Sequence, residues 1–188
     1  MYKILAICGS TRKQSSNLHV ISAFSKVAAN IFTTEVFSEI ADLPHFNPDL
    51  DTEDPPKEIS RFREKLRAAD AILISTPEYA LGVPGTLKNA IDWTVSSMEF
   101  SQKPVALITA GTAGEKAHAS LLGTLLIIES RMTEQTQLVV SAVKSKMNGD
   151  TFTDNKTEIK IQELIESLKQ LIENKSMTLL PRPTIMGN

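Results

Sequence analysis

The sequence predicts an α/β fold, in which a parallel sheet of five strands is covered by helices on both faces. Five short segments that read as strands, most of them apolar, alternate along the chain with stretches whose apolar residues recur every three or four positions. Most of these segments are apolar at nearly every position, which is typical of parallel strands buried on both faces. The 188 residues, 41% of them hydrophobic, suffice for one compact domain, and no repeat or linker divides them.

The first strand and the first helix are separated by a loop rich in hydroxyl groups. Residues 2–8 form an apolar run, and the polar loop 9–17 follows it directly. Helical spacing of apolar residues then extends from Leu18 to Ile31. The second strand is predicted at 33–38.

A long connection rich in Pro, Asp and Asn, residues 39–56, leads to the second helix. That helix is marked by apolar residues at helical spacing, namely Ile59, Phe62, Leu66 and Ala69. The apolar run 71–75 predicts the third strand, and a loop with two prolines and two glycines follows at 76–85.

The third helix is predicted from the spacing of Leu87, Ala90, Ile91, Val95 and Met98. The fourth strand is predicted at 105–109, followed by the loop 110–114. The fourth helix should run from about His118 to Arg131.

The fifth strand is predicted at 136–140, and the polar stretch 144–154 should form an exposed loop or a hairpin. The last helix is marked by apolar residues that include Leu164, Leu168 and Leu171. We expect the tail, residues 175–188, to be loose or to pack on a neighbouring subunit. The alternation of elements fits a five-stranded flavodoxin-like sheet, although periodicity alone does not fix the strand order.

Composition excludes several classes of protein. The net charge of −2 argues against nucleic acid as a partner, because such proteins expose a basic face. No apolar run approaches the ~20 residues that cross a bilayer, and the first residues do not resemble a secretory signal. We therefore expect no membrane partner. The single cysteine fits a reducing cytoplasm, and Cys8, at the end of an apolar run, should be a small buried hydrophobe.

Known catalytic and nucleotide-binding motifs are also missing. The sequence contains no Walker-type phosphate loop, no G-x-G-x-x-G fingerprint and no G-x-S-x-G nucleophile elbow. The three histidines are scattered, and no cluster of ligands has the spacing of a metal site. We expect no catalytic side chain and no metal ligand.

The loop 9–17 is a candidate phosphate site. A helix N-terminus carries backbone N–H groups without intrahelical partners and a partial positive charge. Ser and Thr hydroxyls can donate to phosphate oxygens, and the guanidinium of Arg12 can bind two of them. The alternative is that Ser16 or Asn17 only caps the helix while Arg12 faces water. We favour the phosphate because ligands bind at the carboxyl ends of strands in such sheets.

Two further loops should meet the first at the same edge of a parallel sheet. Residues 77–85 and 109–114 offer hydroxyls, glycines and backbone amides instead of acid–base pairs. Together the three loops could hold a flat cofactor, with its phosphate at one end and its ring at the other. Tyr79 could cover part of an apolar ring face.

Three other polar residues are weighed separately. Glu78 could position a ring, an arginine or a neighbouring chain, and a functional and a structural role are equally open. For Asp92, inside the third helix, a structural hydrogen bond is favoured. His118, near a helix start, should be a cap or a surface residue.

Two motifs resemble the NADPH-dependent FMN reductases, a family that includes enzymes called chromate, azo or quinone reductases. Residues 9–17 read GSTRxxSxN, and residues 76–93 contain TPEY followed by PGxLKNAIDW. The resemblance covers roughly residues 1–125. It implies a flavodoxin-like, doubly wound parallel sheet with the strand order 2-1-3-4-5 and a tightly held FMN.

The motif positions also imply which residues bind the cofactor. Those expected at the FMN phosphate are Ser10, Arg12, Ser15, Ser16 and Asn17. Those expected at the isoalloxazine edge are Pro77, Glu78, Tyr79 and Ala80, with Thr109, Ala110, Gly111 and Thr112 from the next strand.

The resemblance further implies an NAD(P)H oxidoreductase. A hydride would pass from NADPH or NADH to bound FMN and on to a quinone, a free flavin or a similar small acceptor. Residues 1–174 would form the FMN-binding domain and 175–188 a tail, in a homodimer or homotetramer. The chain departs from the family at 80–82, where Ala-Leu-Gly replaces the frequent Asn-Tyr-Ser and should make the rim more apolar.

Two alternatives remain open at this point. The protein could bind flavin without efficient turnover, as an electron carrier or a redox-dependent interaction module. A nucleotide- or sugar-phosphate-binding enzyme could use the same first loop, but that reading leaves the loop after the third strand without a purpose.

Overall fold

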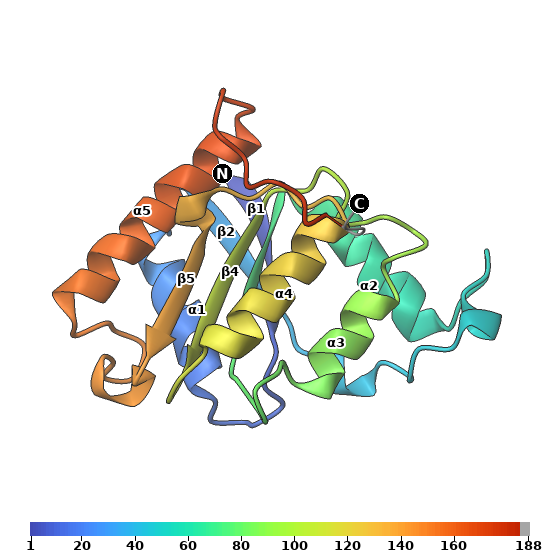
Figure 1. The fold of residues 1–188 in the computed structure, drawn as a ribbon, viewed down its shortest axis with the longest axis horizontal. Coiled ribbons are helices and arrows are strands. Elements are labelled where there is room, and N and C mark those ends of the chain that lie inside the picture. Colours follow the sequence, from blue (N-terminus) through green and yellow to red (C-terminus); the bar gives the residue numbers. More distant parts are fainter. Residues whose placement is uncertain (185–188) are drawn as a thin grey trace.

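The computed structural model describes residues 1–184, in which five parallel strands form one sheet with the order β2-β1-β3-β4-β5 (Figure 1). The strands are β1 (Tyr2–Cys8), β2 (Phe32–Phe37), β3 (Ala71–Thr76), β4 (Val105–Gly111) and β5 (Gln137–Ser141). The helices are α1 (Ser16–Val27), α2 (Lys57–Ala68), α3 (Gly85–Asp92), α4 (Glu115–Ile127) and α5 (Asn155–Ile172). The predicted fold class and strand order are confirmed, with element ends shifted by a few residues.

Helices cover both faces of the sheet, so the molecule has two apolar cores. Helices α1 and α5 pack on one face, and α2, α3 and α4 pack on the other. Side chains of β1 alternate between the cores: Ile4 and Ala6 lie in the first, and Leu5 and Ile7 in the second. This explains why the central strands read as continuous apolar runs.

The register of the sheet brings the carboxyl ends of its strands to one edge. Thr76 at the end of β3 pairs with Thr109 on β4, and Gly111 at the end of β4 pairs with Ser141 on β5. The loops that follow these strands therefore begin side by side.

Helix α3 ends at Asp92, so the prediction that it continues through Val95 and Met98 is wrong. Both side chains are exposed, at 53% and 57%, and Met98 has a left-handed φ of 60°. After Asp92 the backbone hydrogen bonds tighten to a three-residue spacing, since Thr94 N donates to Ile91 O and Val95 N to Asp92 O. Farther along, Arg63 Nε donates at 2.9 Å to the carbonyl oxygen of Trp93, which would accept from Ser97 N in a continuing α-helix.

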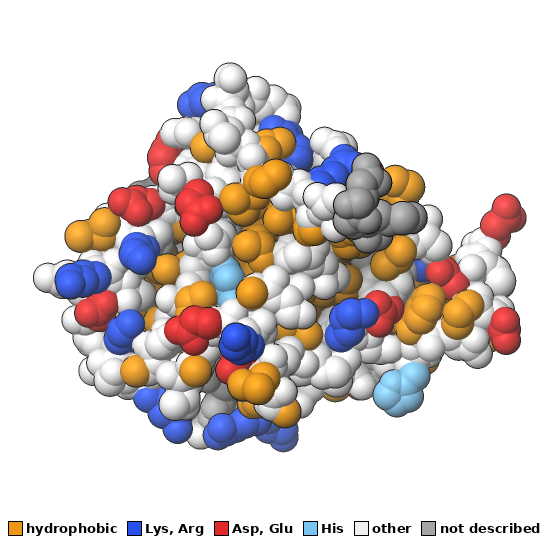
Figure 2. All heavy atoms as spheres, viewed as in Figure 1, with side chains coloured by type: hydrophobic (Ala, Val, Ile, Leu, Met, Phe, Trp, Pro, Cys, Tyr) orange, Lys and Arg blue, Asp and Glu red, His pale blue; other side chains and the backbone are white. Residues whose placement is uncertain are grey.

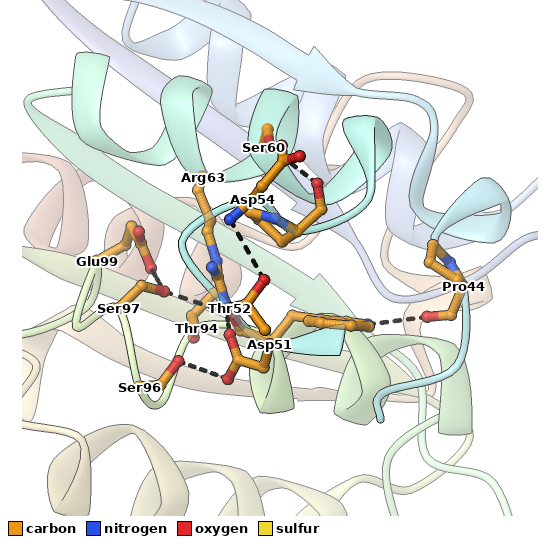
Figure 3. Close-up of polar contacts among 12 residues, drawn as sticks. Pro44, Asp51, Thr52, Asp54, Ser60, Arg63, Thr94, Ser96, Ser97 and Glu99 are labelled. Carbon is orange, nitrogen blue, oxygen red and sulfur yellow. Dashed lines mark hydrogen bonds and ion pairs between the residues drawn. The ribbon is translucent and has the colours of Figure 1, made fainter. Parts of the chain in front are cut away.

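Arg63 also anchors the long connection between β2 and α2. Its Nη2 lies 2.7 Å from Asp51 Oδ1, and Ser96 donates to the other oxygen of that carboxylate at 2.6 Å (Figure 3). Although burial opposes ionisation, the hydrogen bonds from Arg63 and Ser96 lower the pKa of Asp51. The indole nitrogen of Trp93 donates to Pro44 in the same connection at 2.8 Å.

The last part of the chain contains a hairpin and a packed tail. The predicted hairpin within 144–154 is present, with an antiparallel bridge between Met147 and Phe152, and Phe152 is buried. Within residues 175–184 the tail contacts its own chain, because Leu180 N donates to Met132 O at 2.8 Å. Residues 185–188, also assigned to the tail, lie outside the described residues. None of the helices within 1–184 is long and apolar enough to cross a membrane.

Candidate functional site

A cleft of about 430 Å³ opens at the carboxyl edge of the sheet. Its volume lies within the ~300–1,000 Å³ of small-molecule sites. The lining residues come from the loops after β1, β3, β4 and β5: Ser10, Arg12, Ser15, Ser16, Asn17, Pro77, Glu78, Tyr79, Ala110, Gly111, Thr112, Ala142, Val143, Lys144 and Ser145. The three loops that the sequence predicted to converge therefore do so.

The N-terminus of α1 faces this cleft with open hydrogen-bond donors. Ser15 caps the helix, and its hydroxyl accepts from the backbone nitrogen of Asn17 at 3.2 Å. Within residues 1–184, the backbone N–H of Ser16, the first residue of α1, has no hydrogen-bond partner, and neither do those of Thr11 and Gln14 in the loop before the helix. The loop is held close to β3, since a Cβ added to Gly9 would lie 2.5 Å from Thr76 Oγ1.

The N-terminus of α4, by contrast, is already occupied. Glu78 Oε2 accepts from the backbone nitrogens of Lys116 and Ala117, each at 2.9 Å. A carboxylate is stabilised there by the helix dipole. Glu78 thus takes a structural role within this chain, and the start of α1 is left as the helix N-terminus at this cleft with an open N–H within residues 1–184.

The charged groups of the cleft favour an anion. Arg12 and Lys144 line it, and Arg12 is exposed with no side-chain hydrogen bond or ion pair to any residue in 1–184. Among the lining residues that the structure describes, Glu78 is the single acidic one, and one of its carboxylate oxygens already accepts hydrogen bonds from the backbone of α4. Ser10 and Ser15, which also line the cleft, are buried residues.

Of the residues predicted from the resemblance, all but two line the cleft. Thr109 is fully buried in the sheet and does not reach the cleft, and its hydroxyl lies 2.9 Å from His118 Nδ1. Ala80 sits at the exposed tip of a two-residue turn that the Tyr79–Gly82 bridge closes. Asn17 lines the cleft, but its amide is bonded within the protein.

The turn at Ala80 and Leu81 is strained and apolar. Their φ angles are 49° and 63°, in the left-handed region that costs a residue with a Cβ about 1–2 kcal/mol. Leu81 is also 72% exposed. The departure from the family motif at 80–82 thus places two unfavourable features at the edge of the cleft.

The prediction that His118 is a cap or surface residue is wrong, because it is buried between β4 and β5. Its Nε2 pairs with Gln137 Oε1, which fixes a proton on Nε2 and leaves Nδ1 to accept from Thr109. Burial lowers the pKa of His118, against the opposing effects of Gln137, Glu115 and Glu134.

Sequence reasoning missed one wall of the cleft, formed by residues 142–145 after β5. The available signal was their place at the carboxyl end of the fifth strand. The prediction treated the polar stretch from Lys144 onward as an exposed loop and did not extend the argument about strand ends to it.

Two other predictions are confirmed. Cys8 is buried, its Sγ contacts Ser10 O at 3.4 Å, and burial raises the pKa of its thiol, so it is no reactive nucleophile. Asp92 pairs with Lys88 on the surface of α3 at 2.5 Å. Within the described part of the chain, no group of His, Cys, Asp and Glu is placed to hold a metal ion.

Sequence comparison connects this geometry with known proteins. A family model described as NADPH-dependent FMN reductase matches residues 2–146. An NAD(P)H-dependent FMN reductase from Pseudomonas aeruginosa is 34% identical over 178 residues, covering 89% of this chain and 93% of its own. A quinone reductase from Pseudomonas putida is 31% identical over 174 residues, covering 88% and 92%.

Structure comparison agrees with the sequence. A flavoenzyme NAD(P)H:(acceptor) oxidoreductase from Paracoccus denitrificans superposes with a TM-score of 0.76 at 27% identity, covering 94% of this chain and all of that one.

Proposed function

The chain belongs to the NADPH-dependent FMN reductase family and is an NAD(P)H-dependent FMN or quinone oxidoreductase, and from this premise we propose how its cleft holds FMN. The phosphate lies at the N-terminus of α1. The flavin ring lies between the loops after β3 and β4. The observation that carries the proposal is the contrast between the two helix N-termini: α4 is capped by Glu78, whereas the N–H of Ser16 at the start of α1 stays open within residues 1–184.

The residues of the cleft fit FMN at both ends. A phosphate dianion suits backbone N–H donors, serine hydroxyls and the unpaired guanidinium of Arg12. The ring suits the part of the cleft lined by the other two loops. These loops are close together, since a Cβ added to Gly111 would lie 3.8 Å from the backbone nitrogen of Glu78.

When bound, FMN supplies the redox chemistry, because its ring accepts a hydride from NADPH or NADH and passes reducing equivalents to a quinone or a similar acceptor. The chain itself binds and orients. Arg12 and the α1 donors fix the phosphate. Gly111 and Thr112 offer backbone groups to the polar edge of the ring, and half-exposed Tyr79 covers an apolar part. No side-chain nucleophile is required.

We test the assignment by turnover. Protein incubated with FMN and then freed of unbound flavin by gel filtration should stay yellow and should oxidise NADPH when a quinone is added, with NADH measured in parallel to establish the donor preference. Protein that leaves the column colourless would contradict flavin binding. A yellow protein that lacks steady-state turnover would instead be an electron carrier or a redox-dependent interaction module.

The assembly is a homodimer or homotetramer in this proposal. Figure 2 shows hydrophobic side chains gathered on the face where α3 and α4 lie, and exposed apolar residues on or just after these helices include Val95, Met98 and Ile127. Exposed apolar area of this kind is typical of protein interfaces. Light scattering coupled to gel filtration measures the mass. The cytoplasmic location and the division into 1–174 and a tail stay predictions.

A further inference from the structure

Asn17 occupies an unusual place in the cleft. It is the second residue of α1, and only 2% of it is exposed. Its backbone nitrogen donates to the cap, Ser15 Oγ, at 3.2 Å. The motif resemblance assigns Asn17 to the FMN phosphate, but its side chain is directed into the protein.

Both ends of the Asn17 side-chain amide form hydrogen bonds with residues of the sheet, one in β4 and one in β3. Its Nδ2 donates to the carbonyl oxygen of Ala110, at the end of β4, at 3.1 Å. Its Oδ1 accepts from the hydroxyl of Ser75, at the end of β3, at 2.9 Å. The orientation of the amide is fixed chemically, because a carbonyl oxygen requires a donor opposite it.

These two bonds join the two ends of the cleft. The loop that begins α1 carries the open N–H donors and Arg12, and Ala110 begins the wall formed with Gly111 and Thr112. Ser75 is completely buried, so the connection passes through the interior. A buried amide that lost either partner would leave a polar group unsatisfied, which disfavours any movement of one loop away from the other.

We propose that Asn17 is a positioning residue, which sets the separation between the phosphate-binding loop and the wall that contacts the flavin ring. It does so without contacting the phosphate. This inference rests on the proposed function. It predicts that replacing Asn17 weakens the binding of any flavin, with or without a phosphate, whereas replacing a phosphate ligand weakens the binding of FMN alone.

Riboflavin separates the two roles, because it has the ring and no phosphate. We would measure the Kd of FMN and of riboflavin by flavin fluorescence quenching for the wild type, Asn17→Ala, Ser75→Ala and Arg12→Ala. Asn17→Ala should weaken both flavins by a similar factor, about tenfold, the scale of a lost buried hydrogen bond and its orphaned partner. The ratio of the two Kd values should stay near that of the wild type. In Arg12→Ala the Kd of FMN should rise and that of riboflavin should not, so the FMN Kd divided by the riboflavin Kd should rise.

Activity gives a second readout. At saturating FMN and well below the Tm of the variant, Asn17→Ala should still have a lower kcat than the wild type, because the ring is displaced relative to the wall formed by residues 110–112. An effect on stability alone would lower Tm and leave this kcat unchanged. Ser75→Ala removes only a donor and should shift both flavins in the same direction by less, which keeps the test available if Asn17→Ala does not fold.

Two results would overturn the proposal. Loss of FMN affinity with riboflavin affinity retained would make Asn17 a direct phosphate ligand through its second Nδ2 hydrogen. Unchanged Kd values for both flavins in Asn17→Ala and Ser75→Ala would remove the positioning role. Failure of the wild type to bind either flavin would instead contradict the proposed function.

Discussion

Glu78, in the loop after β3, accepts a hydrogen bond of 2.9 Å from the backbone N–H of Ala117, in the first turn of α4. This bond attaches the loop after β3, on one side of the cleft, to α4, which follows the loop after β4 on the other side. It also places a carboxylate on the positive end of α4. In the proposed binding mode the phosphate goes to the start of α1, where no carboxylate within residues 1–184 accepts from the N–H of Ser16.

Replacing Glu78 tests this arrangement. Glu78→Ala leaves two N–H groups of α4 without their acceptor, and helix caps contribute about 0.5–2 kcal/mol. The free energy of unfolding should fall by that amount, and FMN should bind more weakly because the loop 77–79 loses its attachment. Glu78→Gln keeps an acceptor oxygen and should retain most of both properties. Denaturant titration and FMN titration measure them, and wild-type values in Glu78→Ala would contradict the role.

Arg12→Ala should weaken FMN binding by about 1.5–3 kcal/mol, the range of hydrogen bonds to charged groups. The reason is that the guanidinium has no partner within the described residues and can be directed wholly at the phosphate. Lys13→Ala is the matched control, because Lys13 is exposed in the same loop and does not line the cleft. Equal Kd values for Arg12→Ala and the wild type would remove Arg12 from the phosphate site.

Leu81→Gly should stabilise the protein by about 1 kcal/mol. A left-handed φ costs leucine about 1–2 kcal/mol and costs glycine nothing. Relief of this strain outweighs the greater entropy that glycine gives the unfolded chain. Leu179→Gly is the control, since this exposed leucine has no left-handed φ and should gain nothing. Denaturant unfolding at constant pH measures the difference. A less stable Leu81→Gly would show that the side chain makes contacts that offset the strain.

His118 predicts a pH dependence of stability. Its pKa in the folded protein is lowered from 6.5, chiefly by burial, so the unfolded chain binds the proton more readily. The contribution of neutral His118 is therefore complete above pH ~6.5 and is lost as the pH falls below that value. The free energy of unfolding, measured between pH 5 and 8, should fall less toward acid in His118→Gln. The control His45→Gln, at an exposed position, should keep the wild-type slope.

Much of the fold and most of the cleft could be predicted, because they depend on local patterns. Buried parallel strands read as apolar runs, and hydroxyl and glycine residues collect where those strands end. The motifs at 9–17 and 76–93 then supplied the strand order and the lining residues by resemblance. The fourth wall, at 142–145, follows a strand in the same way but carries no motif.

The errors arose where long-range contacts override local pattern. Val95 and Met98 continue the spacing of α3, yet the backbone changes to three-residue turns after Asp92, and Arg63 from α2 takes the carbonyl of Trp93 that a longer helix would use. His118 is polar and near a helix start, which suggests the surface. Only the folded sheet shows that Thr109 and Gln137 lie on either side of it and satisfy both ring nitrogens.

The account depends most on where the cofactor phosphate binds, and a crystal structure of the protein grown with saturating FMN measures this directly. We expect density for the phosphate at the N-terminus of α1, within hydrogen-bond distance of the backbone of Ser16 and the guanidinium of Arg12, with the ring between the loops 77–79 and 110–112. Solvent at the α1 N-terminus, or a phosphate bound elsewhere in the cleft, would contradict it.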